Sequence, residues 1–183
     1  MKKIAGLLFV LLLASRVPAW SQDTPLVEAF GGFSLLTVGV EGLDREWSPG
    51  WQGSFALNLT PTIGIVADFG GQYESQDVLG AQVDSSVHEF LFGPRFSART
   101  EGATPFAHFL LGGARQSSSV SDQEFFRNTN FALGFGGGFD INMGESFSLR
   151  ALQFDWLPMR AGGEWVSNQF RIGIGFVFKT GVY

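Results

Sequence analysis

The stretch at residues 130–142 reads NFALGFGGGFDIN, and its residues alternate between two kinds. Large apolar residues share one parity, and small or polar residues share the other. Successive side chains of a β-strand point to opposite faces, so this stretch predicts a strand with one apolar face and one small, polar face. The apolar members are Phe131, Leu133, Phe135, Phe139 and Ile141.

The same alternation recurs along the chain in runs of about ten residues bounded by turn residues, which is typical of the strands of a membrane barrel. In the last run, FRIGIGFVFK at 170–179, the apolar and polar residues again alternate. The predicted strands are 27–36, 50–59, 63–73, 87–98, 106–116, 130–142, 147–157 and 168–179. In the first and fifth runs, Phe30 and Phe106 are expected on the interior face.

The connections between these runs alternate in length. The segments 60–62, 99–104 and 143–145 are short, 37–49, 74–86 and 117–128 are longer, and 159–166 is intermediate. Bacterial barrels have short periplasmic turns and longer extracellular loops, which places both chain ends in the periplasm. The fold class expected is all-β: an eight-stranded antiparallel up-and-down transmembrane β-barrel, closed because lipid leaves no water for a free sheet edge.

The composition agrees with a surface covered by something other than water. The chain has 183 residues, 20 Phe, 25 Gly and 16% charged residues, whereas a soluble surface carries roughly 25–35%. The absence of Cys excludes disulfides and thiolate chemistry. A soluble lipocalin-like barrel would also show alternation, but the Gly-rich polar faces, the low charge and the alternating turns favour lipid outside.

The N-terminus has the pattern of a cleaved secretory signal. Met1, Lys2 and Lys3 form a basic start, and the apolar run at 4–14 is too short to span a bilayer. Ala19-Trp20-Ser21 predicts cleavage before Gln22, with 17–19 as a second site. We therefore expect a signal peptide at 1–21 and a barrel domain at 22–183 in the outer membrane of a Gram-negative-type envelope. The remaining nine basic and 17 acidic residues, a net charge of −8, disfavour nucleic acid as a partner.

Several segments resemble the small outer-membrane β-barrel proteins with an OmpA-like transmembrane domain. They are WQGSF at 51–55, IVADFGG at 65–71, FLFGPR at 90–95, PFAH at 105–108 and GGGFD at 136–140. The resemblance implies a role in envelope structure, adhesion or small-solute passage. A periplasmic peptidoglycan-binding domain is not expected, because the chain has no room for one.

The last strand resembles the signal by which the barrel assembly machinery recognises such proteins. Its matching residues are Arg171, Gly173, Phe176 and Phe178, although the chain continues to Tyr183, beyond the usual terminal aromatic. The resemblance implies this machinery as a partner during biogenesis. Outer-membrane lipids and lipopolysaccharide are the other expected partners, and we expect a monomer.

Polar residues on the inward parity form the candidate site. They are Asp68, Glu89, Arg95, His108, Asp140, Gln153, Asp155 and Arg171. In a narrow lumen such groups must pair or be hydrated, so a structural plug of ion pairs is expected, with a narrow solute channel as the alternative. If the last turn centres near Gly162 and Gly163, Asp155 and Arg171 face each other in a lumenal salt bridge.

At the outer rim we expect an aromatic girdle of Trp51, Tyr73, Trp156 and Trp165. An enzyme is not expected, and neither is a cofactor or a metal. The competing enzymatic class is a lipid-modifying hydrolase, for which His88 beside Ser85, Ser86 and Glu89 is the candidate. Recognition by extracellular loops is expected at the charged segments 42–47 and 122–127.

Overall fold

The computed structural model describes residues 24–38, 46–78, 81–120, 123–161 and 164–182. The expected signal peptide and its cleavage site lie outside these residues, as does most of the charged segment 42–47. No helix in the described part of the chain is long and apolar enough to cross a bilayer.

Eight long strands form one closed antiparallel barrel, which confirms the predicted fold class. They are β1 (Pro25–Val38), β2 (Glu46–Asn58), β3 (Ile63–Val78), β4 (Ala81–Ser97), β5 (Ala103–Val120), β6 (Gln123–Asn142), β7 (Phe147–Trp156) and β10 (Phe170–Val182). Each pairs with its neighbour in sequence, and β10 pairs with β1 to close the sheet. The short strands β8 (Met159–Ala161) and β9 (Glu164–Val166) form a hairpin between β7 and β10.

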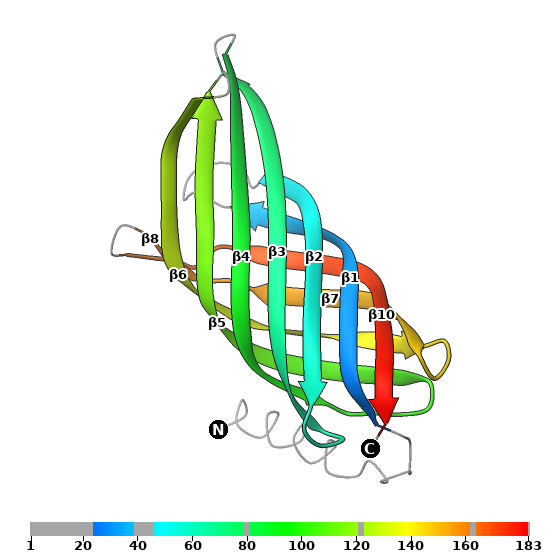
Figure 1. The fold of residues 1–183 in the computed structure, drawn as a ribbon. Helices are drawn as coiled ribbons and strands as arrows, with labels where there is room; N and C mark the ends of the chain where they lie inside the picture. The colour runs from blue at the N-terminus through cyan, green and yellow to red at the C-terminus, as the bar shows by residue number, and fades with distance from the viewer. Residues whose placement is uncertain (1–23, 39–45, 79–80, 121–122, 162–163, 183) are drawn as a thin grey trace, which may run out of the picture.

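The central strands are longer than the sequence pattern predicts. Residues 74–86 and 117–128 were expected to be loops, but most of them continue β3, β4, β5 and β6, so this expectation is wrong. Hydroxyl and amide side chains replace the apolar face here, and a strand beyond the bilayer needs no such face. Figure 1 shows these four strands rising above the ends of β1 and β2, at the end opposite the start of β1 and the end of β10.

Large apolar side chains cover the outside of the barrel. Phe55 and Phe178 are 61% and 62% exposed, and large apolar side chains from every long strand join them on the outer surface. The inner face of the sheet carries the charged residues instead. This is the reverse of a soluble β-protein, so the lipocalin-like alternative is not the fold observed. Phe30 and Phe106 are 5% and 7% exposed and lie inside, as expected.

A β-bulge in β7 changes which residues face the lumen. Gly173 pairs with Gln153, but Gly175 pairs with Arg150, so β7 carries one residue more than β10 between these pairs. The register with β6 shifts at the same place. A bulge reverses the in-out alternation beyond it. Arg150 and Gln153 are therefore both buried, although their parities differ.

Candidate functional site

Arg171 lies at the centre of a buried cluster of carboxylates contributed by three other strands. Its Nη2 atom is 2.6 Å from Asp68 Oδ1 and 2.7 Å from Asp155 Oδ2, and its Nη1 atom is 2.7 Å from Glu89 Oε2. The Arg171 side chain is fully buried. Charge-assisted hydrogen bonds of this length are strong, and one guanidinium here joins β3, β4, β7 and β10 across the lumen.

Further polar side chains extend this cluster around the lumen. His108 Nε2 lies 2.8 Å from Asp155 Oδ1, and Gln153 Nε2 donates to Asp155 Oδ2 over 2.8 Å. Gln52 Nε2 donates to Asp68 Oδ2 over 2.8 Å. Each of these contacts adds a hydrogen-bond partner to a carboxylate that also binds Arg171, which offsets part of the cost of removing the charge from water.

A second cluster lies nearer the end of the barrel that holds the chain ends. Arg150 binds Asp140 through two nitrogens, with 2.8 Å between Arg150 Nε and Asp140 Oδ1 and 3.1 Å between Nη2 and Oδ2. Arg95 donates to Glu28 over 2.9 Å and to Asp140 over 3.3 Å. Arg99 donates to Glu28 over 2.6 Å. These ion pairs are bidentate or shared, the geometry in which guanidinium groups bind most strongly.

Two aromatic rings pack against the guanidinium groups of this second cluster. The Arg95 and Arg150 guanidinium carbons lie 4.2 and 4.4 Å from the centre of the Phe106 ring, and Arg150 lies 4.1 Å from that of Phe30. Cations attract the faces of aromatic rings, most strongly away from water. The two inward rings thus fill the lumen and stabilise its charges. Arg150 Nη1 also donates to Gln153 Oε1 over 2.8 Å, which connects the two clusters.

The structure places all eight sequence-predicted lumenal residues inside the barrel, and the most exposed of them, His108, is 7% exposed. The expected Asp155 to Arg171 contact is present, and the two residues are directly paired in the β7–β10 register. Sequence reasoning missed other members of the network: Glu28, Gln52, Asn58, Arg99 and Arg150. Glu28 shares the parity of Phe30, so its placement was readable from the sequence. Arg150 was hidden by the bulge.

Glycines on the lumenal face leave the space that the network occupies. A Cβ atom on Gly136 would collide with Asp155 Oδ1, and one on Gly70 would lie 2.7 Å from Glu89 Oε2 and 3.0 Å from Arg171 Nη1. Glycine permits this close approach because it has no side chain. The Gly spacing in β6 is therefore matched to the position of the charged groups on the neighbouring strands.

A buried group of apolar side chains packs in the lumen beside the Arg171 cluster. Leu91, Leu110 and Leu157 approach one another around Gly134, whose missing Cβ would lie 3.2–3.4 Å from all three. Met159 belongs to the same buried group and is 1% exposed. Met159 pairs with Ala132 of β6 in the same register as β7, so β8 continues β7 along β6. These apolar side chains fill space in the lumen next to the charged groups.

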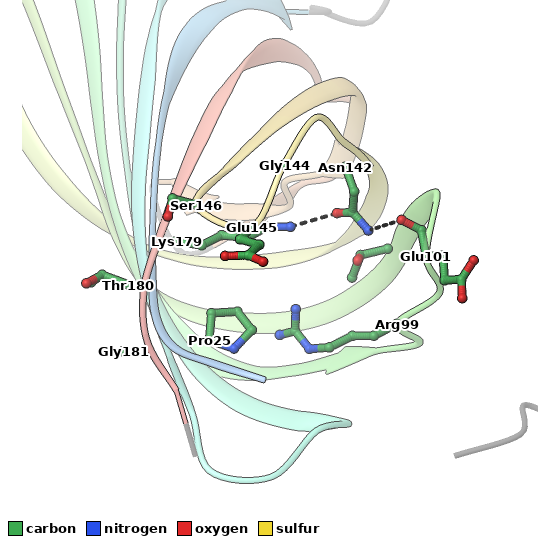
Figure 2. Close-up of a pocket in the computed structure, with 11 residues that line it drawn as sticks. Pro25, Arg99, Glu101, Asn142, Gly144, Glu145, Ser146, Lys179, Thr180 and Gly181 are labelled. Atoms are coloured by element: carbon green, nitrogen blue, oxygen red, sulfur yellow. Dashed lines mark hydrogen bonds between the residues drawn. The ribbon is translucent and has the colours of Figure 1, made fainter. Parts of the chain in front are cut away.

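A pocket of about 540 Å³ opens at the other end, beside the chain ends. Figure 2 shows Arg99 and Lys179 reaching into it from different strands, with Glu101 and Glu145 at its border. Lys179 Nζ donates to Asn142 Oδ1 over 2.7 Å. Both basic groups already have protein partners, so the pocket is the mouth of the lumenal network, with two cations and two anions around it.

The expected girdle residues all lie on the outer surface. Trp51, Tyr73, Trp156 and Trp165 are 45%, 50%, 36% and 50% exposed. Trp51 Nε1 donates to Tyr73 Oη over 3.4 Å, and Trp156 Nε1 donates to the Ser167 carbonyl over 2.6 Å. The Trp165 ring contacts Phe131 edge to face, with centroids 6.2 Å apart. Each ring therefore combines an apolar contact with a polar tip.

The residues of the hydrolase alternative are not brought together. His88 points outward and lies 3.3 Å from Tyr73 Oη, whereas Glu89 points into the lumen and binds Arg171. Consecutive residues of a strand face opposite sides, so Glu89 cannot orient the His88 imidazole. In β10, Arg171 and Gly173 face inward, while Phe176 and Phe178 face outward at 49% and 62% exposure.

The fold has apolar side chains on its outer surface and charged side chains in its interior. These features define the class: a small eight-stranded barrel of the transmembrane type. No protein-family model matches the sequence. None of the curated proteins matches it either. Solved structures match over most of the chain. Their sequence identity to this chain is low, so the match establishes the fold alone.

Three of these structures are outer-membrane or surface proteins. Ail, the attachment invasion locus protein of Yersinia pestis, solved with the heparin analogue sucrose octasulfate, is 17% identical, with a TM-score of 0.61 over 85% of this chain and 99% of its own. Neisserial surface protein A is 11% identical, with a TM-score of 0.65 over 84% and 96%. The N-terminal β-barrel domain of Pseudomonas aeruginosa OprF is 16% identical, with a TM-score of 0.55 over 86% and 98%.

Proposed function

We propose that this protein is a closed, non-conducting β-barrel of the bacterial outer membrane, with a structural or adhesive role in the envelope and no catalysis. The observation that carries the proposal is the filled interior. Four guanidinium groups and five carboxylates are tied into ion pairs across the lumen, and buried apolar side chains pack beside them. An ion would have to displace these pairs in order to pass.

A plug is energetically favoured over a channel. Breaking a buried ion pair costs about 3–5 kcal/mol, because the remaining charge stays away from water. A permeant ion would meet several such pairs in succession, with buried apolar side chains packed beside them. The alternative, a narrow channel for small solutes, is supported by the polar lining of the lumen and requires the Arg171 cluster to open.

The proposed partners are suggested by the apolar outer surface and by the residue pattern of β10. The apolar exterior supports contact with the lipids of the outer membrane, including lipopolysaccharide in its outer leaflet. The pattern of β10 supports recognition by the barrel assembly machinery. The short connections 59–62, 98–102 and 143–146 support a periplasmic position for that end of the barrel. A complete barrel has no free sheet edge along its membrane part, which supports a monomer.

The extension of β3–β6 supports the adhesive part of the proposal. It presents two sheet edges and a polar surface beyond the ends of the other strands, in the position where a barrel meets its surroundings (Figure 1). Ail, a structural neighbour, is by name an attachment protein. Hydrolysis has less support, because His88 and Glu89 lie on opposite faces of β4.

Two measurements test this proposal. Electrophoresis of an isolated outer-membrane fraction, boiled and unboiled, should show a heat-dependent shift in mobility, because a closed barrel resists SDS until heated. Planar bilayer recording of the refolded protein should then show no stable conductance steps. A periplasmic protein without a shift would contradict the membrane placement. Stable conductance from a protein that does shift would replace the plug with the channel.

A further inference from the structure

The outer face of β3–β6 changes from apolar to basic within one step of the strand register. Phe69, Phe90, Gly113 and Phe131 are paired across the four strands and form one row. This row contains three phenylalanine rings and one glycine. Two residues further toward the extension, the paired row is Gly71–His88–Arg115–Thr129. The next row is Tyr73–Ser86–Ser117–Arg127. Such a boundary is expected where the hydrocarbon of a bilayer meets its headgroups.

Arg115 is the central cation of this boundary. It follows the fully buried Ala114 on β5, so its side chain is on the outward parity, next to His88 on one side and Thr129 on the other. Within the described part of the chain, no carboxylate forms an ion pair with Arg115. A cation at the membrane surface without an acidic partner is complementary to an anionic headgroup.

The neighbouring aromatic residues hold His88 in place. Trp51 Nε1 donates to Tyr73 Oη over 3.4 Å, and Tyr73 Oη lies 3.3 Å from His88 Nε2. The Tyr73 and His88 rings meet edge to face with centroids 5.6 Å apart. Trp51 covers Gly71, where a Cβ atom would collide with the indole. The polar atoms of three strands are thus arranged at one height beside Arg115.

The apolar row below Arg115 has a gap at its centre. Gly113 is directly opposite Phe90 and Phe131, whose rings are 46% and 48% exposed. Glycine therefore interrupts the row of rings immediately beneath the guanidinium. An acyl chain can approach the sheet at this point while the headgroup above it reaches Arg115.

We propose that Arg115 and His88, with Thr129 beside them, bind the phosphate group of a lipid in the outer leaflet, and that its acyl chain packs over Gly113 between Phe90 and Phe131. The inference rests on the proposed membrane placement and names a specific lipid site on it. Arginine donates two parallel hydrogen bonds to phosphate oxygens, and the histidine and threonine add donors from the adjacent strands.

The test is native mass spectrometry of the full mature chain released from detergent, with lipid A and enzymatically dephosphorylated lipid A of the same acyl composition as probes. The wild-type protein should retain lipid A in preference to the dephosphorylated form. Arg115→Gln should weaken lipid A binding by about tenfold, the value expected for one lost charge-assisted hydrogen-bond pair. His88→Gln should weaken it less. Arg115→Lys should weaken binding less than Arg115→Gln does, because the charge remains although the pair of parallel hydrogen bonds is lost.

Lys179→Gln is the matched control, because it removes one positive charge at the opposite end of the barrel and should change nothing. Each variant must first show the heat-dependent shift of the folded barrel. Equal retention of the two lipids, or an unchanged Arg115→Gln variant, would overturn the site. Displacement of lipid A by millimolar inorganic phosphate would also overturn it, in favour of a general anion site. Retention of neither lipid by a protein without the shift would instead contradict the membrane placement.

Discussion

Arg150 and Asp140 form a two-nitrogen ion pair inside the barrel only because β7 contains a bulge at Ala151. The Arg150 Nε to Asp140 Oδ1 distance is 2.8 Å, and both side chains are buried. If Ala151 were paired in a regular ladder instead, alternation from Gln153 and Asp155 would direct Arg150 outward, toward lipid. The bulge therefore determines how many charges the lumen holds.

Deletion of Ala151 should leave the barrel able to form and keep Arg150 in the lumen. Ala151 has no partner in the register with β6, and without it only Leu152 separates Arg150 from Gln153, which places both on the inner face of a regular strand. The heat-dependent mobility shift should be retained. Ala151→Ser, which keeps the residue count and the bulge, should retain the shift as well. Loss of the shift in the deletion variant alone would show that the bulge itself is required.

Arg171→Met should lower the free energy of unfolding by about 3–5 kcal/mol, because three carboxylates lose their common partner in a buried site. Asp155→Asn in the same chain should restore part of the loss, and adding Asp68→Asn should restore more. Urea titration in detergent micelles or vesicles measures these differences. Arg127→Met, on the exposed outer face, is the control and should change stability by less than about 1 kcal/mol, because an interaction of an exposed charge is screened by water. No recovery in the double or triple variants would contradict a shared pairing.

Gly136→Ala should destabilise the barrel by about 1–3 kcal/mol, because the added methyl group occupies the position of Asp155 Oδ1. Gly31→Ala is the matched control, since a Cβ at that outward position meets nothing within 4 Å. Comparison of the two urea midpoints isolates the effect of lumenal space from the general effect of replacing glycine. Equal midpoints would mean that the network shifts to accept the methyl group at little cost.

Phe92→Arg should destabilise the protein in vesicles by about 2–4 kcal/mol, the cost of a lipid-facing charge near the middle of a bilayer. Phe92 is 49% exposed on β4, within the apolar band. Ser75→Arg lies on the extension beyond that band and should be tolerated. Unfolding in the same vesicles provides the comparison. A similar cost for both substitutions would place the bilayer elsewhere on the barrel.

The inward polar residues were predictable where alternation runs without interruption. Asp68, Glu89, Asp155 and Arg171 each lie in a regular strand whose other face is apolar, and a two-residue period is enough to assign them. The pairing of Asp155 with Arg171 followed from the hairpin register alone. The length of β3–β6 was not predictable in this way, because strands outside a bilayer carry no apolar face to mark them.

By itself, the sequence determined the eight strands, their closure and the polarity of their two faces, since all of these follow from local alternation and from the need of backbone groups in lipid for hydrogen-bond partners. Only the tertiary structure decided which charges meet. Arg171 contacts residues from three other strands, Arg150 enters the lumen through a bulge, and Leu91, Leu110 and Leu157 converge around Gly134. These contacts depend on strand tilt, register shift and the curvature of the closed sheet, which join residues up to 103 positions apart and leave no periodic mark in the sequence.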